Sequence, residues 1–454
     1  MAQRKLPRAS RVMGSAAMGA ALALMPVLPA HAATTIDVDC TGDTGAALQG
    51  AIGSALDGDT VRLTPFCVYT LTTEASPGDG LPAIVGKSIT VLGRGATIQR
   101  PPTESDFRIF EVGIDGALDL QDVTVMGGAL TGNGGGIAIR NHGTLTAERT
   151  RFEGNIARIT GAGGAIFSES VSSITLTDCT VADNSADQGG GIQAGSDLTL
   201  TRTVVRGNRG QIAGGVISFT DTLTVQDSTI KDNSASVLAG GLFVGSGTAD
   251  VQNTRILDNT GARVGGVDVG TSATATITGS FINGNTVTDA SGALSGGGGV
   301  RTTGDTTIDS TEIRGNRLIG DNGRGAGISA PSGTLTLRNN SSVTANLASG
   351  RYSRGGGLYA DGTTTGVTVS VAGSHLDGNK VTGTGSTAAG VYNNGGAISF
   401  TSSTVNNNTA PNAPAPGGVS TTVPITSVDG ATTFTGNTPT NCLLSPAAVT
   451  NCTN

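Results

Sequence analysis

The sequence reads GGAIF at 163–167, TVADN at 180–184 and GGGIQ at 189–193. A glycine pair opens a short apolar run, a lone Asn closes the next segment, and a second glycine pair begins the pattern again. The same order recurs along most of the chain. A recurrence of this length indicates a repeat fold, in which each unit packs on its neighbours.

Eleven asparagines set the length of the repeat, because they follow one another at steps of 24 to 33 residues. An apolar residue lies three positions before each Asn, and apolar residues spaced by two, such as Leu198 and Leu200, precede that position. A spacing of two is typical of β-strands, whose side chains alternate between the two faces. The eleven are Asn155, Asn184, Asn208, Asn233, Asn259, Asn285, Asn316, Asn346, Asn379, Asn408 and Asn437.

The residue before each Asn is nearly always Gly, Asp or Asn, which tolerate left-handed backbone angles. We therefore expect a tight turn there, followed by a ladder in which each Asn stacks on the next and bonds otherwise unpaired turn backbone. The glycine pairs, such as Gly190-Gly191, would open the next strand where adjacent coils pack closely. The pattern predicts an all-β fold, a right-handed parallel β-helix of about 12 coils with three short strands per coil.

The N-terminus carries four basic residues, an apolar stretch and Ala30-His31-Ala32, which predicts a secretory signal peptide cleaved after Ala32. Beyond it, the repeat divides the chain into a cap, a solenoid and a second cap. The predicted segments are the signal peptide (1–32), an N-terminal cap with a helix and the first strands (33–83), the β-helix (84–440) and a disulfide-closed C-terminal cap (441–454).

A short amphipathic helix is expected in the N-terminal cap, where it would cover the open apolar end of the solenoid. Gly58 would stop this helix. Its apolar face would comprise Ala47, Leu48, Ala51, Ile52, Ala55 and Leu56.

Charge and hydropathy restrict the partners. Four of the 27 basic residues lie in the predicted signal peptide, so the exported chain would carry 23 basic against 34 acidic residues, a net charge of −11. Such an acidic chain argues against nucleic acid and anionic membranes as partners. No further apolar stretch of about 18 residues could span a bilayer. We expect an exported, extracellular protein.

Five cysteines in an oxidising compartment suggest two disulfides and one leftover thiol. Cys40 with Cys67 would close the N-terminal region, and Cys442 with Cys452 would tie the last residues. Cys179 falls in a column that otherwise holds Ser or Thr, two positions before the apolar residue of each repeat. We therefore expect a small buried residue there rather than a reactive thiol.

GGAI at 163–166 and 395–398 alternates with Phe-x-x-Asn at 152–155 and 434–437. In these motifs the chain resembles the repeats of polymorphic outer membrane proteins and of other secreted bacterial β-helix proteins. The helical stretch followed by GDTVRL is similar to the entry into many pectate-lyase-like β-helices. The resemblance covers about residues 40–440. It implies a free passenger-like domain without the autotransporter barrel, and it implies no activity.

Two candidate sites stand out, and each has a structural alternative. Asp183, Asp232 and Asp258 share the turn column before the Asn, and stacked carboxylates could hold Ca²⁺, the one cofactor that the pattern suggests. Alternatively, the turn simply selects a residue that tolerates left-handed angles.

The second candidate is the loop ASGRYSRGGGLYADG, residues 348–362. Arg351, Tyr352, Arg354 and Tyr359 would form a polar and aromatic ligand site there, unless the loop is only a decorated turn. The linear signatures of polygalacturonases are absent, so no catalytic residues are assigned.

The favoured function is a secreted, non-catalytic module for surface binding, adhesion or a structural role, towards polysaccharide or a cell surface. The alternative is a polysaccharide lyase or glycoside hydrolase acting beside the coil loops, because β-helix enzymes assemble their sites from adjacent coils. A second alternative is ice binding, since Thr-x-Thr recurs at 175–177, 199–201 and 276–278, although Thr is also a good strand former.

Overall fold

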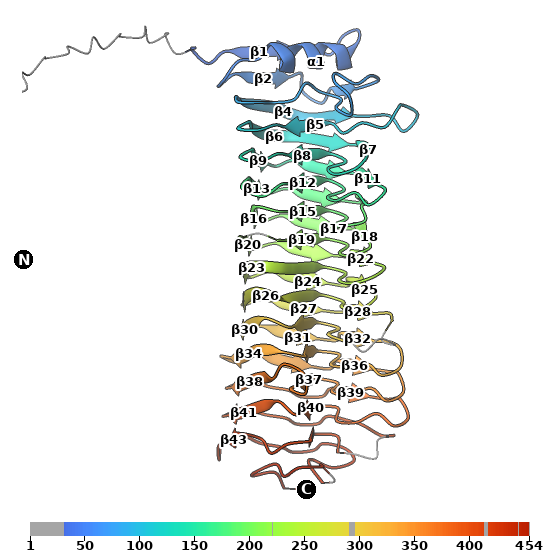
Figure 1. Ribbon diagram of the computed structural model, residues 1–454, viewed down its shortest axis with the longest axis vertical. Helices are drawn as coiled ribbons and strands as arrows, with labels where there is room; N and C mark the ends of the chain where they lie inside the picture. The colour runs from blue at the N-terminus through green and yellow to red at the C-terminus, as the bar shows by residue number, and fades with distance from the viewer. Residues whose placement is uncertain (1–30, 220, 290–295, 413–415, 444, 454) are drawn as a thin grey trace, which may run out of the picture. The chain divides into compact units, whose positions relative to one another are not determined.

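The computed structural model describes residues 31–219, 221–289, 296–412, 416–443 and 445–453. Most of the predicted signal peptide lies outside the described residues. Residues Ala33–Asn454 form one compact unit. This unit is an all-β parallel solenoid of about 14 turns with one short helix, which confirms the predicted fold class (Figure 1).

Most coils contribute three main strands, and strands within the stack pair in parallel with their counterparts in the coils before and after them. The first strand follows the glycine pair, the second carries the apolar residues spaced by two, and the third ends just before the Asn. First strands are β5 (Phe110–Val112), β8 (Ile137–Ile139), β12 (Ile166–Ser168), β15 (Ile192–Ala194), β19 (Val216–Ser218), β29 (Val300–Thr302), β33 (Ile328–Ala330), β37 (Leu358–Asp361), β40 (Val391–Asn394) and β42 (Val419–Thr421).

Second strands are β1 (Thr35–Val38), β2 (Thr60–Leu63), β9 (Thr144–Glu148), β13 (Ser173–Thr177), β16 (Asp197–Thr201), β20 (Thr222–Gln226), β30 (Asp305–Asp309), β34 (Gly333–Arg338), β38 (Val367–Ala372), β41 (Ala397–Thr401) and β43 (Ser427–Val428). Third strands are β3 (Val68–Thr70), β10 (Arg151–Glu153), β14 (Thr180–Ala182), β17 (Val204–Arg206), β21 (Thr229–Lys231), β24 (Arg255–Leu257), β27 (Phe281–Asn283), β31 (Glu312–Arg314) and β35 (Ser342–Thr344).

Four long strands pass through a corner without a break. Of these, β23 (Leu242–Gln252) and β26 (Val267–Thr278) serve as both first and second strands, while β4 (Ser88–Gln99) and β6 (Ala117–Met126) serve as both second and third strands. The inward side chains of all these strands form one continuous apolar core along the stack.

The turn count exceeds the predicted 12 because the stack extends beyond the Asn repeat at its start. β1 pairs with β2, and β2 pairs with β4, so rungs of the second-strand sheet precede the first Asn. A short fourth strand was also not predicted. It directly follows the Asn turn in many coils. The backbone groups there form hydrogen bonds with the equivalent strand of the next coil. Fourth strands are β7 (Ala129–Thr131), β11 (Ile156–Arg158), β18 (Arg209–Gly210), β22 (Ser234–Ala235), β25 (Thr260–Gly261), β28 (Thr286–Val287), β32 (Arg317–Leu318), β36 (Leu347–Ala348) and β39 (Lys380–Val381).

The eleven Asn side chains form a buried ladder. In a typical rung, the Asn208 backbone N–H and the Asn208 Nδ2 both donate to Asn233 Oδ1, at 3.0 and 2.9 Å. Nδ2 also donates to the carbonyl of Val181 in the preceding coil, at 3.0 Å. Asn208 is completely buried, so the ladder satisfies polar groups that water cannot reach.

In most coils the glycine directly before the first strand lies against this ladder, and Ala165 takes its place in one coil. A Cβ built on Gly241 would come within 2.7 Å of the Gly266 carbonyl oxygen and 3.1 Å of Asn259 Nδ2. Glycine and asparagine therefore recur together because the amide occupies the space that a side chain would need. This glycine column is Gly136, Gly191, Gly215, Gly241, Gly266, Gly299, Gly327, Gly357, Gly390 and Gly418.

Helix α1 (Thr44–Ser54) packs at the N-terminal end of the solenoid, beside β1 and β3 (Figure 1). Asp43 caps it by accepting a hydrogen bond from the Ala46 N–H at 3.0 Å. Leu48, Ala51, Ile52 and Ala55 are buried as predicted.

The predicted end of this helix and two residues of its apolar face are wrong. The helix stops at Ser54, because Ala55 is extended and the Leu56 N–H bonds the carboxylate of Asp59 instead of a helical carbonyl. Leu56 is consequently 53% exposed. Ala47 is also exposed.

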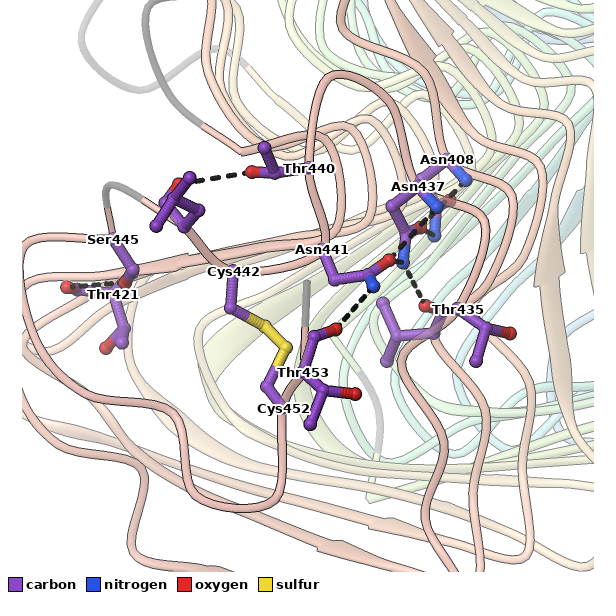
Figure 2. The surroundings of a disulfide bond; sticks show 12 residues. Asn408, Thr421, Thr435, Asn437, Thr440, Asn441, Cys442, Ser445, Cys452 and Thr453 are labelled. Carbon is purple, nitrogen blue, oxygen red and sulfur yellow. Dashed lines mark hydrogen bonds between the residues drawn. A yellow bond between two sulfur atoms is a disulfide. The ribbon is translucent and has the colours of Figure 1, made fainter.

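Disulfides lie in both end regions, between Cys40 and Cys67 and between Cys442 and Cys452. Near the second, Asn441 continues the ladder: its Oδ1 accepts from Asn437 Nδ2 at 2.9 Å (Figure 2). The domain boundaries at 83/84 and 440/441 stay predictions. Among the described residues, no helix is long and apolar enough to cross a membrane.

Candidate binding surface

The first strands carry one outward-pointing side chain per coil, two positions after the glycine column, and several of these side chains, including Ile217, Asp268 and Tyr359, are buried. This column of outward side chains, the first-strand surface, changes character along the stack. The strand registers align Phe167, Gln193, Ile217, Phe243, Asp268, Arg301, Ser329, Tyr359, Tyr392 and Ser420.

Arginine and tyrosine side chains interleave on the first-strand surface of β37 and β40. The rings of Tyr359 and Tyr392 are parallel, with centroids 5.8 Å apart. The Arg324 guanidinium lies 5.3 Å from the Tyr359 ring centroid, and that of Arg354 lies 5.2 Å from the Tyr392 centroid. We name these four residues, with Asp361, the Arg–Tyr cluster. Guanidinium groups over aromatic faces are held by cation–π attraction.

Asp361 fixes the geometry of the cluster. Its Oδ2 accepts a hydrogen bond from the Tyr359 hydroxyl at 2.8 Å and lies 3.5 Å from Arg324 Nη1, and Thr363 and Asn394 donate to its Oδ1. Burial and the bond to Asp361 raise the pKa of Tyr359, so its hydroxyl stays a proton donor. Despite the burial of Asp361, the hydrogen bonds from Thr363 and Tyr359 hold the pKa of its carboxyl below the usual value.

The four residues predicted for the loop at 348–362 divide between two places. Arg354 and Tyr359 belong to the Arg–Tyr cluster. Arg351 instead pairs with Asp321 of the preceding coil, at 2.7 Å, and the exposed Tyr352 ring lies against Gly385. The local loop is therefore not one site.

The acidic turn column places Asp183, Asp232 and Asp258 on the surface, each with a positive φ. Asp183 pairs with Arg206 at 3.3 Å, and Asp232 pairs with Lys231 at 3.3 Å. Within the described ranges, no three acidic, His or Cys side chains gather closely enough to hold a metal ion. The positive φ values support the turn interpretation of this column.

A chain of alternating charges crosses the early coils of the first-strand surface. Arg108 contacts Asp79 and Glu111, each at 3.0 Å, and Arg140 contacts Glu111 at 2.7 Å and Glu169 at 3.2 Å. Burial raises the pKa of Asp79 to about 6 in spite of Arg108. A hollow of about 460 Å³ opens beside Glu111, Arg140 and Glu169.

The second strands carry a longer run of outward Thr and Ser than the sequence motifs suggested. Strand registers align one column through Thr146, Thr175, Thr199 and Thr224 and, further along, Thr276, Thr307 and Thr336. Asp250 interrupts this column, and Asp305 and Asp309 flank it. The array is therefore charged at several coils.

Cys179 is 2% exposed, and its thiol donates to the carbonyls of Ala147 and Thr177. Burial raises the pKa of this thiol to about 11, which leaves it protonated at neutral pH. It takes the place of the Ser or Thr side chain that the equivalent position holds in the neighbouring coils, such as Thr150 and Thr203.

Sequence reasoning missed Arg324, Tyr392 and Asp361. The signal was present, however, because Arg324 and Arg354 each lie three residues before a glycine of the column, and both tyrosines lie two residues after one. An alignment of the coils on their glycines, rather than on their asparagines, predicts that these side chains lie together.

A family model described as "Right handed beta helix region" matches residues 111–262. No curated protein matches the chain. Among solved structures, the A-module of mannuronan C-5 epimerase AlgE6 from Azotobacter vinelandii is similar, with 14% sequence identity and a TM-score of 0.34. That match covers 87% of this chain and 96% of the epimerase module.

Proposed function

We propose that the chain is an exported, extracellular β-helix module that binds an anionic polysaccharide without cleaving it. The Arg–Tyr cluster is the observation that carries this proposal. The repeat resemblance to polymorphic outer membrane proteins, with the two disulfides, fits a surface-exposed binding or adhesion role.

The cluster repeats at the spacing of the coils. Parallel strands lie about 4.8 Å apart, so the two Arg–Tyr pairs form a short linear array along the stack. A sugar polymer running along that direction would meet the two guanidinium groups in succession, with the half-buried Tyr392 ring beside them, while the buried Tyr359 ring supports Arg324 from below. Arginine binds carboxylate and sulfate groups with two parallel hydrogen bonds, which favours an acidic polymer.

The proposal predicts that acidic polysaccharides retard residues 33–454 in native affinity gels, whereas neutral ones do not. Replacing both Arg324 and Arg354 by Gln should weaken retardation at least ~10-fold, because it removes both cations of the array. Arg151→Gln with Arg206→Gln, on third-strand arginines outside the cluster, is the matched control. Equal retardation of both double variants would contradict the assignment of the cluster.

A second candidate function is polysaccharide cleavage, as a lyase or glycoside hydrolase. The hollow beside Glu111, Arg140 and Glu169 favours it, since two carboxylates and a cation line one opening. Binding is preferred because Arg140 contacts both carboxylates, which leaves neither as an unengaged acid. Ice binding is less favoured still, because charged residues interrupt the Thr array.

A further inference from the structure

A second opening lies on the first-strand surface, between the alternating charges of the early coils and the Arg–Tyr cluster. It has a volume of about 290 Å³ and is lined by Phe243, Arg263, Asp268, Thr271, Arg301 and Thr303. These residues come from three successive coils, carried by β23, β26 and β29 or by the loops around them.

Asp268 and Arg301 form a buried ion pair in this opening. Asp268 Oδ1 lies 2.9 Å from Arg301 Nη1, and the Asp268 side chain is 1% exposed. Its Oδ2 and the Arg301 Nε have no hydrogen-bond partner. Burial raises the pKa of Asp268, and Arg301 opposes that rise. Buried polar groups are nearly always paired, so two unpaired atoms in one ion pair point to a ligand that pairs with them.

The lining specifies the chemistry of that ligand. Arg263 is exposed at the rim, and no acidic residue in the described ranges pairs with it, so the opening holds two guanidinium groups and one carboxylate. This excess of positive charge favours an anion. Asp268 lines the opening, and its Oδ2, which has no partner within the protein, is the oxygen left for a ligand. Such an oxygen accepts a hydrogen bond from a hydroxyl group.

Phe243 supplies an apolar wall, supported at 5.8 Å by the edge-on ring of Phe219. A pyranose ring carries C–H groups that pack on such a wall. The required ligand thus has a ring with an apolar face, hydroxyl donors and a negative group. We propose that this opening, the uronate pocket, binds one uronic acid unit, with its carboxylate on Arg263 and a hydroxyl on Asp268.

This inference rests on the proposed function and deepens it. Asp268 and Arg301 align with Tyr359 through Ser329 on the same first-strand surface. A chain held by the Arg–Tyr cluster would therefore reach the uronate pocket if it followed the stack towards the N-terminus. The pocket would then select for uronate in a polymer that the cluster binds by charge.

The test measures saturation-transfer NMR signals and dissociation constants for sodium glucuronate and for glucose, with residues 33–454. We expect saturable binding of glucuronate, none of glucose, and at least a 10-fold higher dissociation constant in Arg263→Gln and in Asp268→Asn. Arg255→Gln, an exposed arginine on the third strand, is the control and should bind as the wild type. Thermal melts identify a variant that fails to fold, and Arg263→Gln alters only an exposed side chain.

Two results would overturn the uronate pocket: no glucuronate binding by the wild type, or unchanged binding in Arg263→Gln. The same protein samples are also run on native affinity gels that contain the acidic polymer. This second measurement distinguishes failure of the pocket from failure of the proposed function. Retardation without any effect of the pocket variants would reject the pocket alone. If the wild type is not retarded, the proposed function is rejected. The glucuronate titration would still show whether the pocket binds a uronate.

Discussion

Asn259→Ala is expected to lower the free energy of unfolding by about 3–5 kcal/mol, since unpaired buried polar groups cost about 1–3 kcal/mol each. Asn259 Oδ1 accepts from the backbone and the side chain of Asn233, and its Nδ2 donates to Ile230 and Asn285. Truncation would remove these four bonds in a water-free interior, although Asn233 Nδ2 keeps its bond to Val205 and Asn285 Oδ1 keeps the Asn259 backbone N–H. The loss exceeds that of an ordinary surface substitution because four hydrogen bonds disappear together.

Urea denaturation of residues 33–454 checks this expectation, with the change read from the transition that includes the central coils. Asn141→Ala is the matched control, since Asn141 is exposed and lies outside the ladder. A stability change in Asn259→Ala no larger than in Asn141→Ala would mean that the ladder contributes little. The explanation of the Asn repeat would then fail.

Gly241→Ala is expected to destabilise the solenoid by about 1–3 kcal/mol, the usual range for overpacking a well-packed interior. The new methyl group would lie 2.7 Å from the Gly266 carbonyl oxygen and 3.1 Å from Asn259 Nδ2. Neither neighbour is a flexible side-chain end, so the two coils must separate or the rung must break.

Gly50→Ala is the control, and it is expected to raise the stability rather than lower it. A Cβ on Gly50 would meet nothing within 4 Å, and the residue lies inside helix α1. Alanine should therefore stabilise by about 0.5–1 kcal/mol. Thermal melts of both variants measure the contrast, and equal shifts would show that contact with the ladder does not explain the glycine column.

The repeat could be read from the sequence because its two constraints act at fixed positions. Asn208 and Gly241 represent columns in which one residue type predominates, with Ala165 as an exception in the glycine column, so the spacing survives insertions elsewhere. The fourth strands could not be read in the same way. They are two or three residues long, and their register comes from backbone pairing between coils rather than from side-chain type.

The candidate site was only half visible for a related reason. Arg354 and Tyr359 were found because they are close in sequence, whereas Tyr392 reaches them through the stacking of coils. Asp268 and Arg301 escaped notice because 31 residues separate Asn285 from the next Asn, more than in the preceding coils. When the coils are aligned on their asparagines, Asp268 and Arg301 therefore fall at different positions.

The central claim is that this solenoid binds an acidic polysaccharide without cleaving it. The most direct test incubates residues 33–454 with acidic polysaccharides, with Ca²⁺ and with chelator. Bound protein, new reducing ends and unsaturated products are then measured in the same samples. We predict retention of the protein on the polymer and no product in either condition. Release of reducing ends or unsaturated products would contradict the claim and direct attention to Glu111, Arg140 and Glu169.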